Sequence, residues 1–167
     1  NMKHRIFVAI NIPEELKNIT EARIERFYKN DLARVVKREN WHITVVFCGY
    51  LNDKDVEALT EIVKDVCSKL KPFEFIPQKI LFAPQNRPRM IWLIFKNSSQ
   101  FADFKNKIED EMFSYQAEGL FKSFRQEMRE PEPHLTLARF EESYFSQIKN
   151  ILPQKGVDLN KETDSFP

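Results

Sequence analysis

Glycine is scarce in this chain: only three occur in 167 residues, Gly49, Gly119 and Gly156. Loops that cradle phosphate groups through the backbone, such as the P-loop and the Rossmann turn, need several glycines at fixed short spacings. Three widely separated glycines exclude both devices. Nucleotide chemistry of those two kinds is therefore ruled out.

Cysteine and long apolar runs are also scarce. The two cysteines, Cys48 and Cys67, each lie in an apolar pattern, which is typical of reduced core residues and not of a disulfide framework or a metal knuckle. No apolar run approaches the length of a membrane span, and the first residues lack a signal-peptide pattern. We expect a cytoplasmic protein that does not associate with membranes.

Neither sign of charge is in excess. Lys and Arg number 26 and Asp and Glu 25, a formal net charge of +1. This balance argues against a protein that coats long nucleic acid or an anionic membrane by charge alone, although it permits a local basic pocket. Hydrophobic residues make up 42% of the chain, enough for a core in one domain or two small lobes.

The hydrophobic pattern predicts alternating strands and helices. Strands are expected over 5–11, 41–48, 73–82 (broken at Pro77), 90–95 and 134–140. Helices are expected from 13 to about 29, from 53 to 70 behind a cap at Asn52 or Asp53, from 99 to 112 behind Ser98 or Ser99, and over 144–152. Residues 115–132 are expected to form a long loop, and 153–167 no clear element.

One pattern occurs twice. The segments HITVVFCGYLNDKDVEAL and HLTLARFEESYFSQI each run from His-apolar-Thr-apolar to a Phe and then to a helix-like stretch. Two halves of one duplicated unit would look like this. With three histidines in the chain, two such motifs arise by chance in roughly 1 of 10,000 sequences of this composition.

The spacing of the two motifs has a chemical meaning. In a strand, residues two apart point to the same face, so His42 lies beside Thr44, and His134 beside Thr136. Imidazoles can give and take protons near neutral pH, and hydroxyls can donate hydrogen bonds to phosphate oxygens. No third ligand stands at the spacing of a metal site. The pattern predicts a phosphoester site without a metal or another cofactor.

The paired motifs resemble those of the two-histidine (2H) phosphoesterase superfamily, and most closely its RNA 2′,3′-cyclic phosphodiesterases, historically called 2′-5′ RNA ligases. The resemblance extends over most of the chain, through the stretches RIFVAINIPEEL, NWHITVVFCGYL, FAPQNRPRMIWL and EPHLTLARF.

The resemblance implies an α+β fold. It is bilobal, pseudo-twofold and duplicated, with antiparallel sheets lining a central cleft and helices outside. Residues 1–167 would form one such domain, in which each lobe contributes one motif, 42–45 or 134–137. The family usually closes with a further strand after its last helix, and we expect none here.

The resemblance also implies roles for individual residues. The catalytic pair is His42 and His134, and the sequence itself does not decide which is acid and which is base. We take His134 as the base on water and His42 as the acid for the leaving O3′. Substrate phosphate would be bound by Thr44, Thr136 and Arg139, while candidate base or RNA contacts are Phe7, Trp92 and Arg89.

The function expected is metal-independent hydrolysis of the 2′,3′-cyclic phosphate on an RNA 3′ end or nucleotide, to a 2′-phosphomonoester, by a monomer. Three alternatives stay open. The same four motif residues would serve 2′-5′ ligation of tRNA halves or hydrolysis of a cyclic ADP-ribose phosphate. The third is an RNA- or nucleotide-binding module with a non-catalytic site.

Overall fold

The computed structural model describes residues 2–25 and 31–160, and its contacts divide the chain into two compact units. Unit 1 comprises Asn1–Ile10, Thr44–Glu74 and Asn97–Glu132, and unit 2 comprises Asn11–Ile43, Phe75–Lys96 and Pro133–Pro167. The boundary falls inside the first motif, between Ile43 and Thr44. The second motif belongs wholly to unit 2, so the expected division of one motif to each lobe does not match these two units.

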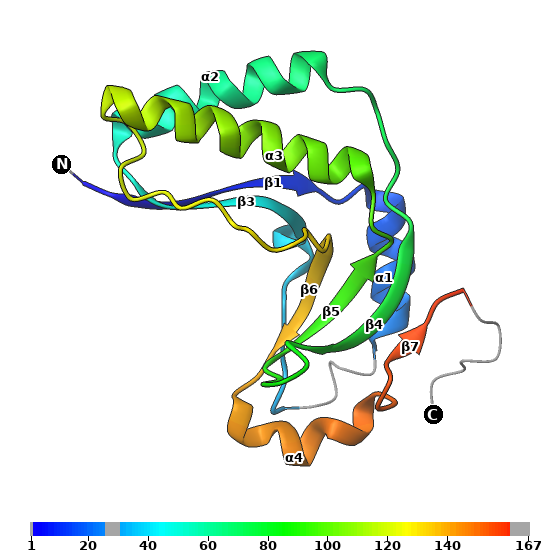
Figure 1. The fold of residues 1–167 in the computed structure, drawn as a ribbon. Coiled ribbons are helices and arrows are strands. Elements are labelled where there is room, and N and C mark those ends of the chain that lie inside the picture. The colour runs from blue at the N-terminus through cyan, green and yellow to red at the C-terminus, as the bar shows by residue number, and fades with distance from the viewer. Residues whose placement is uncertain (1, 26–30, 161–167) are drawn as a thin grey trace. The chain divides into compact units, whose positions relative to one another are not determined.

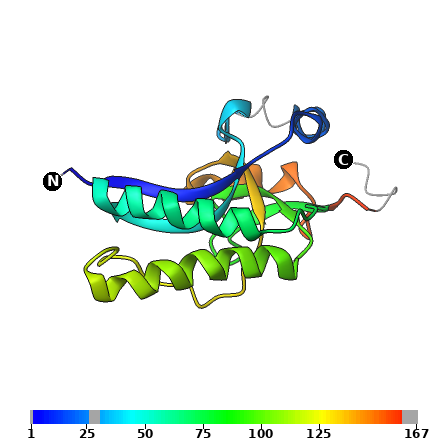
Figure 2. The same cartoon turned by 90° about the horizontal axis from the view of Figure 1, so that it is seen from above.

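Unit 1 is built on two neighbouring strands and two long helices. Strand β1 is His4–Asn11 and β3 is His42–Leu51, and helices α2 (Asp53–Lys69) and α3 (Ser99–Ser114) pack against each other. The two helices run side by side in both views (Figures 1 and 2). The short helix η3 (Tyr115–Glu118) follows α3.

The helices of unit 1 begin where the sequence indicates. Asn52 caps α2, accepting from the backbone N–H of Asp55 at 3.0 Å, and the Asp55 side chain accepts from Asn52 in return. Ser98 caps α3, and its hydroxyl accepts from the backbone N–H of Phe101 at 3.4 Å. The buried face of α3 carries the predicted apolar residues, Phe101, Phe104, Ile108 and Met112.

The predicted loop after residue 115 is confirmed, apart from the turn of η3. It packs through two buried phenylalanines, Phe121 and Phe124. The backbone N–H of Phe121 donates to the Asp55 carboxylate at 2.9 Å, and Ser123 donates to the carbonyl of Tyr50 at 3.2 Å. These contacts hold the loop to the α2 and β3 parts of its own unit.

Unit 2 is an antiparallel sheet with shorter helices. Its strands β6 (His134–Arg139), β5 (Met90–Phe95), β4 (Pro77–Ala83) and β7 (Val157–Asp158) are hydrogen-bonded in that order, and β2 (Arg34–Val35) also pairs with β6. Its helices are α1 (Glu14–Ile24), η2 (Arg38–Asn40), η4 (Glu142–Tyr144), α4 (Phe145–Ile148) and η5 (Lys149–Ile151). The α+β class with antiparallel pairing is confirmed.

Three expectations about unit 2 need correction or limits. The helix begun at Glu14 reaches Ile24, and its expected continuation to residue 29 lies largely outside the described residues. The strand expected from 73 begins only at Pro77, because proline has no N–H for a ladder and suits a strand's first residue. The expected last helix is divided into the short turns η4, α4 and η5.

The expectation of no strand after the last helix is wrong. Val157 and Asp158 form β7, paired with Ile80 and Lys79 of β4. Gly156, with φ +75°, comes so close to β4 that an added Cβ would lie 2.5 Å from the Ile80 carbonyl oxygen. A two-residue strand in a polar stretch has no periodicity to reveal it, so only the pairing itself identifies it.

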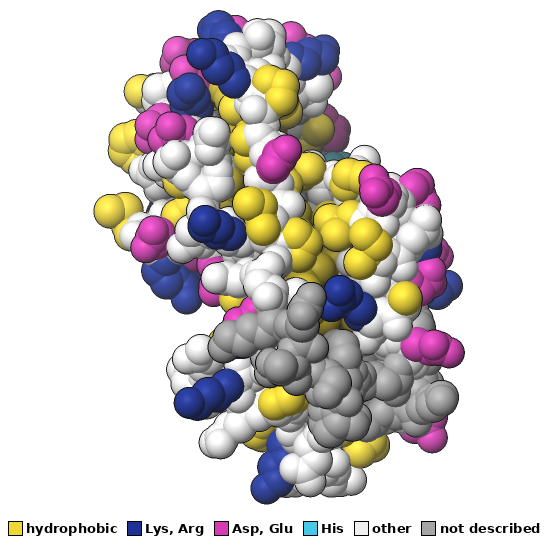
Figure 3. All heavy atoms as spheres, turned by 90° about the vertical axis from the view of Figure 1, so that its right-hand side faces the viewer, with side chains coloured by type: hydrophobic (Ala, Val, Ile, Leu, Met, Phe, Trp, Pro, Cys, Tyr) yellow, Lys and Arg dark blue, Asp and Glu magenta, His cyan; other side chains and the backbone are white. Residues whose placement is uncertain are grey.

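The surface agrees with the balanced composition. On the face drawn in Figure 3, basic and acidic side chains are interspersed among apolar ones, and no large patch of one sign is visible among the residues coloured there. Within the described ranges, no helix is both long and apolar enough to cross a membrane.

Candidate functional site: paired histidine strands

The two motifs are brought together by one pairing. Ile43 of β3 lies opposite Leu135 of β6 in an antiparallel ladder, and both side chains are buried. Because neighbouring residues point to the other face, His42 and His134 lie together on the face opposite to that buried pair. As diagonal neighbours they have Cα atoms about 7–8 Å apart. That spacing leaves room for a phosphate group between two imidazoles.

The threonines share that orientation. Thr136 follows His134 by two residues, and the ladder places it across from His42. Thr44 follows His42 by two residues on β3, as the first residue of unit 1. Along each strand the histidine and the threonine are partly buried, while the residue between them is buried. Each threonine therefore points to the same side of its strand as its histidine.

The ring of His42 is oriented by a backbone carbonyl. Its Nδ1 lies 2.7 Å from the carbonyl oxygen of Asn40. A carbonyl only accepts, so Nδ1 carries the proton, and Nε2 is the nitrogen that can exchange one. This arrangement suits a group that gives or takes a proton at Nε2.

The turn that presents Asn40 is tied to α1 by Arg38. The guanidinium donates to Glu14 at 2.7 Å, to Asn18 at 2.6 Å and to Glu21 at 2.5 Å. The hydrogen bond from Arg38, with a smaller one from Lys17, lowers the pKa of the Glu14 carboxyl. Helix α1 thus fixes the turn η2 from which β3 and His42 begin.

His134 is stacked on an indole. The rings of His134 and Trp92 lie with centroids 3.7 Å apart and planes inclined by 15°. Trp92 is on β5, directly across from Thr136, and Ile94 is across from His134. Trp92, which was predicted as a base or RNA contact, therefore lies against the imidazole of His134.

Arg139 reaches the site's face because of a β-bulge. On β5, Ile91 and Trp92 are consecutive, yet they pair with Ala138 and Thr136 of β6, so Leu137 is an extra residue. Leu137 and Ala138 are both fully buried, and Arg139 then turns to the face of His134 and Thr136. Its Nη1 donates to the sulfur of Met90 at 3.3 Å. Without the bulge, Arg139 would point to the opposite face.

The first motif has the same burial pattern, and it ends on Phe47. Residues 42–47 and 134–139 both run partly buried, buried, partly buried, buried, buried, exposed. Phe47 is 52% exposed, stacks on the predicted residue Phe7 with centroids 6.3 Å apart, and has the guanidinium of Arg5 4.9 Å from its ring centroid. Phe47 was not among the residues predicted from the sequence, although it stands five residues after His42, as Arg139 does after His134.

Among the described residues, no contact links Arg89 to His42 or His134. Its side chain is exposed, and its carbonyl accepts the backbone N–H of Phe140 at 2.9 Å. The pKa of the Glu142 carboxyl is lowered mainly by the hydrogen bond from Arg87 and, less strongly, by the charge of Arg89. Arg89 therefore lies in the electrostatic neighbourhood of Glu142.

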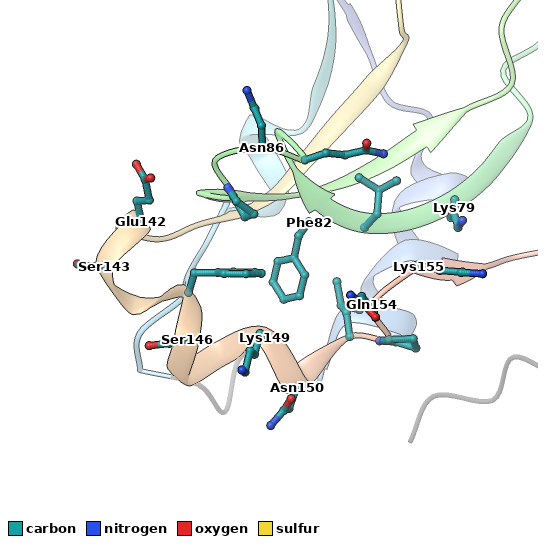
Figure 4. A pocket seen from close by; sticks show the side chains of 16 residues that line it. Lys79, Phe82, Asn86, Glu142, Ser143, Ser146, Lys149, Asn150, Gln154 and Lys155 are labelled. Carbon is teal, nitrogen blue, oxygen red and sulfur yellow. The ribbon is translucent and has the colours of Figure 1, made fainter.

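A large hollow of unit 2 is separate from these residues. Its volume is about 1360 Å³, and it lies between β4, the loop after β4 and the α4–η5 turn (Figure 4). Its polar side chains include three lysines, Lys79, Lys149 and Lys155. None of the predicted site residues lines it, and it contains no histidine, so it offers no acid–base pair.

A metal-binding cluster is not found in the described part of the chain, where no three His, Cys, Asp or Glu side chains are grouped to hold an ion. The chemistry that the site residues offer is proton transfer by two imidazoles, with hydroxyl and guanidinium donors beside them. An antiparallel α+β fold in which two His-x-Thr strands pair in this way defines the class of two-histidine phosphoesterases.

The chain belongs to the LigT-like phosphoesterase family, whose profile matches residues 9–92. Among curated proteins it is 30% identical over 141 residues to an RNA 2′,3′-cyclic phosphodiesterase of Methanothermobacter thermautotrophicus, covering 83% of this chain and 72% of that one. It is 26% identical to a protein of the same name in Bacillus subtilis, covering 83% and 73%.

Solved structures share the fold. The protein TT0787 of Thermus thermophilus has a TM-score of 0.66 at 18% identity, over 83% of this chain and 75% of that one. Escherichia coli LigT, solved in complex with phosphate, has a TM-score of 0.60 at 18% identity, over 83% and 72%. The identification as a member of the 2H superfamily, made from the two motifs, is confirmed.

Proposed function

We propose that this protein hydrolyses the 2′,3′-cyclic phosphate at RNA 3′ ends to a 2′-phosphomonoester, using His42 and His134 without a metal. The observation that carries the proposal is the pairing of Ile43 with Leu135, which puts both imidazoles on one face of unit 2. The names of the curated relatives, RNA 2′,3′-cyclic phosphodiesterases, support the choice of substrate.

The reaction uses one histidine as base and the other as acid. Neutral His134 takes a proton from water as the water oxygen forms a bond to phosphorus. The bond between phosphorus and O3′ breaks, and protonated His42 gives the Nε2 proton to O3′. The carbonyl of Asn40, 2.7 Å from Nδ1, accepts the Nδ1 proton, so Nε2 is the nitrogen that gives the proton to O3′. The product carries a 2′-phosphate and a free 3′-hydroxyl.

The threonines and Arg139 would bind the phosphate oxygens. Negative charge grows on these oxygens in the transition state, and fixed donors near them lower the barrier. Thr136 and Arg139 lie on the face of β6 that carries His134, and Thr44 lies on that side of β3. The guanidinium contributes charge as well as hydrogen bonds.

The exposed aromatic pair of unit 1 is the candidate surface on which a base of the RNA would stack. Phe7 and Phe47 form a stacked surface with Arg5 beside it. Base stacking on an aromatic ring is tolerant of sequence, which suits an enzyme that acts on RNA ends in general. Arg89 stays a candidate contact to the RNA.

The deciding experiment is a hydrolysis assay in EDTA on a short RNA that ends in a 2′,3′-cyclic phosphate. It compares wild type, His42→Ala and His134→Ala, with His4→Ala as the matched control, because His4 is an exposed histidine that pairs with Asp53 on unit 1. We expect turnover by wild type and His4→Ala, and a loss of at least about 100-fold in each of the other two. The position of the product phosphate identifies the leaving oxygen.

Other outcomes point to the alternatives. Folded wild type that binds the RNA without turning it over would support a binding module. Joining of two RNA halves in the same assay would support ligation, in which a ribose 5′-hydroxyl replaces water. Turnover that disappears in EDTA would contradict the metal-free mechanism. The monomeric state and the cytoplasmic location stay predictions.

A further inference from the structure

The rings of Trp92 and His134 are closer together than most stacked aromatic pairs, whose centroids are usually about 4.5–7 Å apart. The ring centroids are 3.7 Å apart and the planes are nearly parallel, at 15°. The indole face therefore covers one whole face of the imidazole, and this limits how the ring can turn about its side-chain bonds. The face of an indole also attracts a positive charge, more strongly than the face of a phenylalanine ring does.

The indole N–H does not account for a tryptophan at this position. The Nε1 of Trp92 is buried and makes no hydrogen bond among the described residues. A buried donor without a partner is unfavourable. The other tryptophan, Trp41, is satisfied, because its Nε1 donates to the carbonyl of Val36 at 2.9 Å. A phenylalanine at position 92 would remove the unpaired N–H and keep an apolar ring.

The charged groups near His134 bear on the effect of its aromatic partner. In unit 2, the pairings place four basic groups on its face of the sheet: His42 on β3, Arg139 on β6, Arg34 on β2 across from Arg139, and Lys79 on β4 across from Ile94. One acid, Asp158 of β7, shares this face, and it lies beyond Ile94 and across from Lys79. Strand β5 contributes none, and the acidic residue nearest along the chain is Glu132. Positive neighbours disfavour a charged imidazole, and an aromatic face opposes that effect.

We propose that Trp92 is a positioning residue for His134: it holds the plane of the imidazole and stabilises the positive charge that the ring acquires when it takes the proton from water. The proposal deepens the proposed function and rests on it for the role of His134 as base. The contact between the two rings, however, can be tested without any turnover.

The test is an NMR titration of the His134 imidazole, assigned with His134→Gln, in wild type, Trp92→Phe and Trp92→Leu. We expect the titration midpoint to move to lower pH by about half a unit in Trp92→Leu and by less in Trp92→Phe. The acidic limb of the kcat profile should move in the same direction, with a fall in its plateau and little change in KM. Trp92→Phe should also unfold at no lower temperature than wild type.

The matched control is Trp41→Phe, which loses a satisfied hydrogen bond and should lower the unfolding temperature without moving the His134 midpoint. An unchanged midpoint in folded Trp92→Leu would overturn the proposal, and Trp92→Phe decides if the leucine variant does not fold. A moved midpoint with an unchanged pH profile would overturn the role in catalysis. Absence of turnover by wild type would defeat the proposed function alone, since the titration still reports on the ring contact.

Discussion

Phe47 and Arg139 occupy the same position in two copies of one strand pattern. Each stands five residues after a motif histidine, directly after two consecutive buried residues, and each is exposed. On β6 the two buried residues belong to a β-bulge, which shifts the alternation of side chains by one and turns Arg139 to the face of His134. One copy therefore ends on an aromatic ring and the other on a guanidinium.

Replacing Arg139 should weaken binding of the substrate phosphate. A hydrogen bond to a charged group contributes about 1.5–3 kcal/mol, so Arg139→Met should lower kcat/KM by about 10- to 100-fold. Arg139→Lys should fall between, since lysine keeps the charge but not the planar fork. The control is Arg87→Met, because Arg87 is paired with Glu142 and its side chain is 72% exposed. Equal kinetics for Arg139→Met and Arg87→Met would contradict the assignment.

Replacing Phe47 should affect recognition of the base and leave the chemical step intact. Stacking on an aromatic side chain contributes about 1–3 kcal/mol per base, so Phe47→Ala should raise KM by about 5- to 100-fold with little change in kcat. The control is Tyr50→Ala, at another exposed aromatic residue of β3, 60% exposed. A cyclic phosphate on a ribose without a base should show no difference between wild type and Phe47→Ala. A KM that rises equally for that substrate would argue against stacking.

Substitution of Gly156 should destabilise the protein more than substitution of Gly49. Both have positive φ, +75° and +74°, but an added Cβ meets the Ile80 carbonyl at 2.5 Å at Gly156 and nothing within 4 Å at Gly49. Gly49→Ala should cost about 1 kcal/mol from backbone strain alone, and Gly156→Ala about 2–3 kcal/mol as β7 is pushed from β4. Urea unfolding of both variants measures the difference, and equal costs would show that the β7 contact is not tight.

Cys48 should stay unreactive in the folded protein. Burial raises the pKa of its thiol to about 12, whereas the exposed Cys67 meets solvent directly. Alkylation at pH 8 should label Cys67 alone, and label Cys48 only after unfolding, as mass spectrometry of peptides can show.

The buried thiol should also make stability depend on pH. Because the pKa of the Cys48 thiol is raised in the folded protein, its contribution to the free energy of unfolding is fully present below the ordinary thiol pKa of 9.0. The contribution is lost as the pH rises from there toward 12. Cys48→Ser should flatten that loss.

Most helices and strands were predicted closely, because apolar periodicity and helix caps depend only on residues near each other in the chain. Strand β5 matches its expected range of 90–95, and α2 begins at the predicted cap, Asn52. The errors lie where the signal is weak or not local. The strand β7 has two residues and exists only through pairing with β4, and the last helix is too short and uncapped for periodicity to define it.

The two histidines, their threonines and the class of chemistry could be recognised from the local pattern, because alternation along a strand depends only on neighbouring residues. The remaining features depend on the pairing of strands. Tertiary structure chose the register that sets Ile43 against Leu135, the bulge that turns Arg139 toward His134, and the strand that brings Trp92 under the same ring. These are pairings between segments far apart in the chain. Their register is selected by which side chains can be buried together, and no local pattern records that choice.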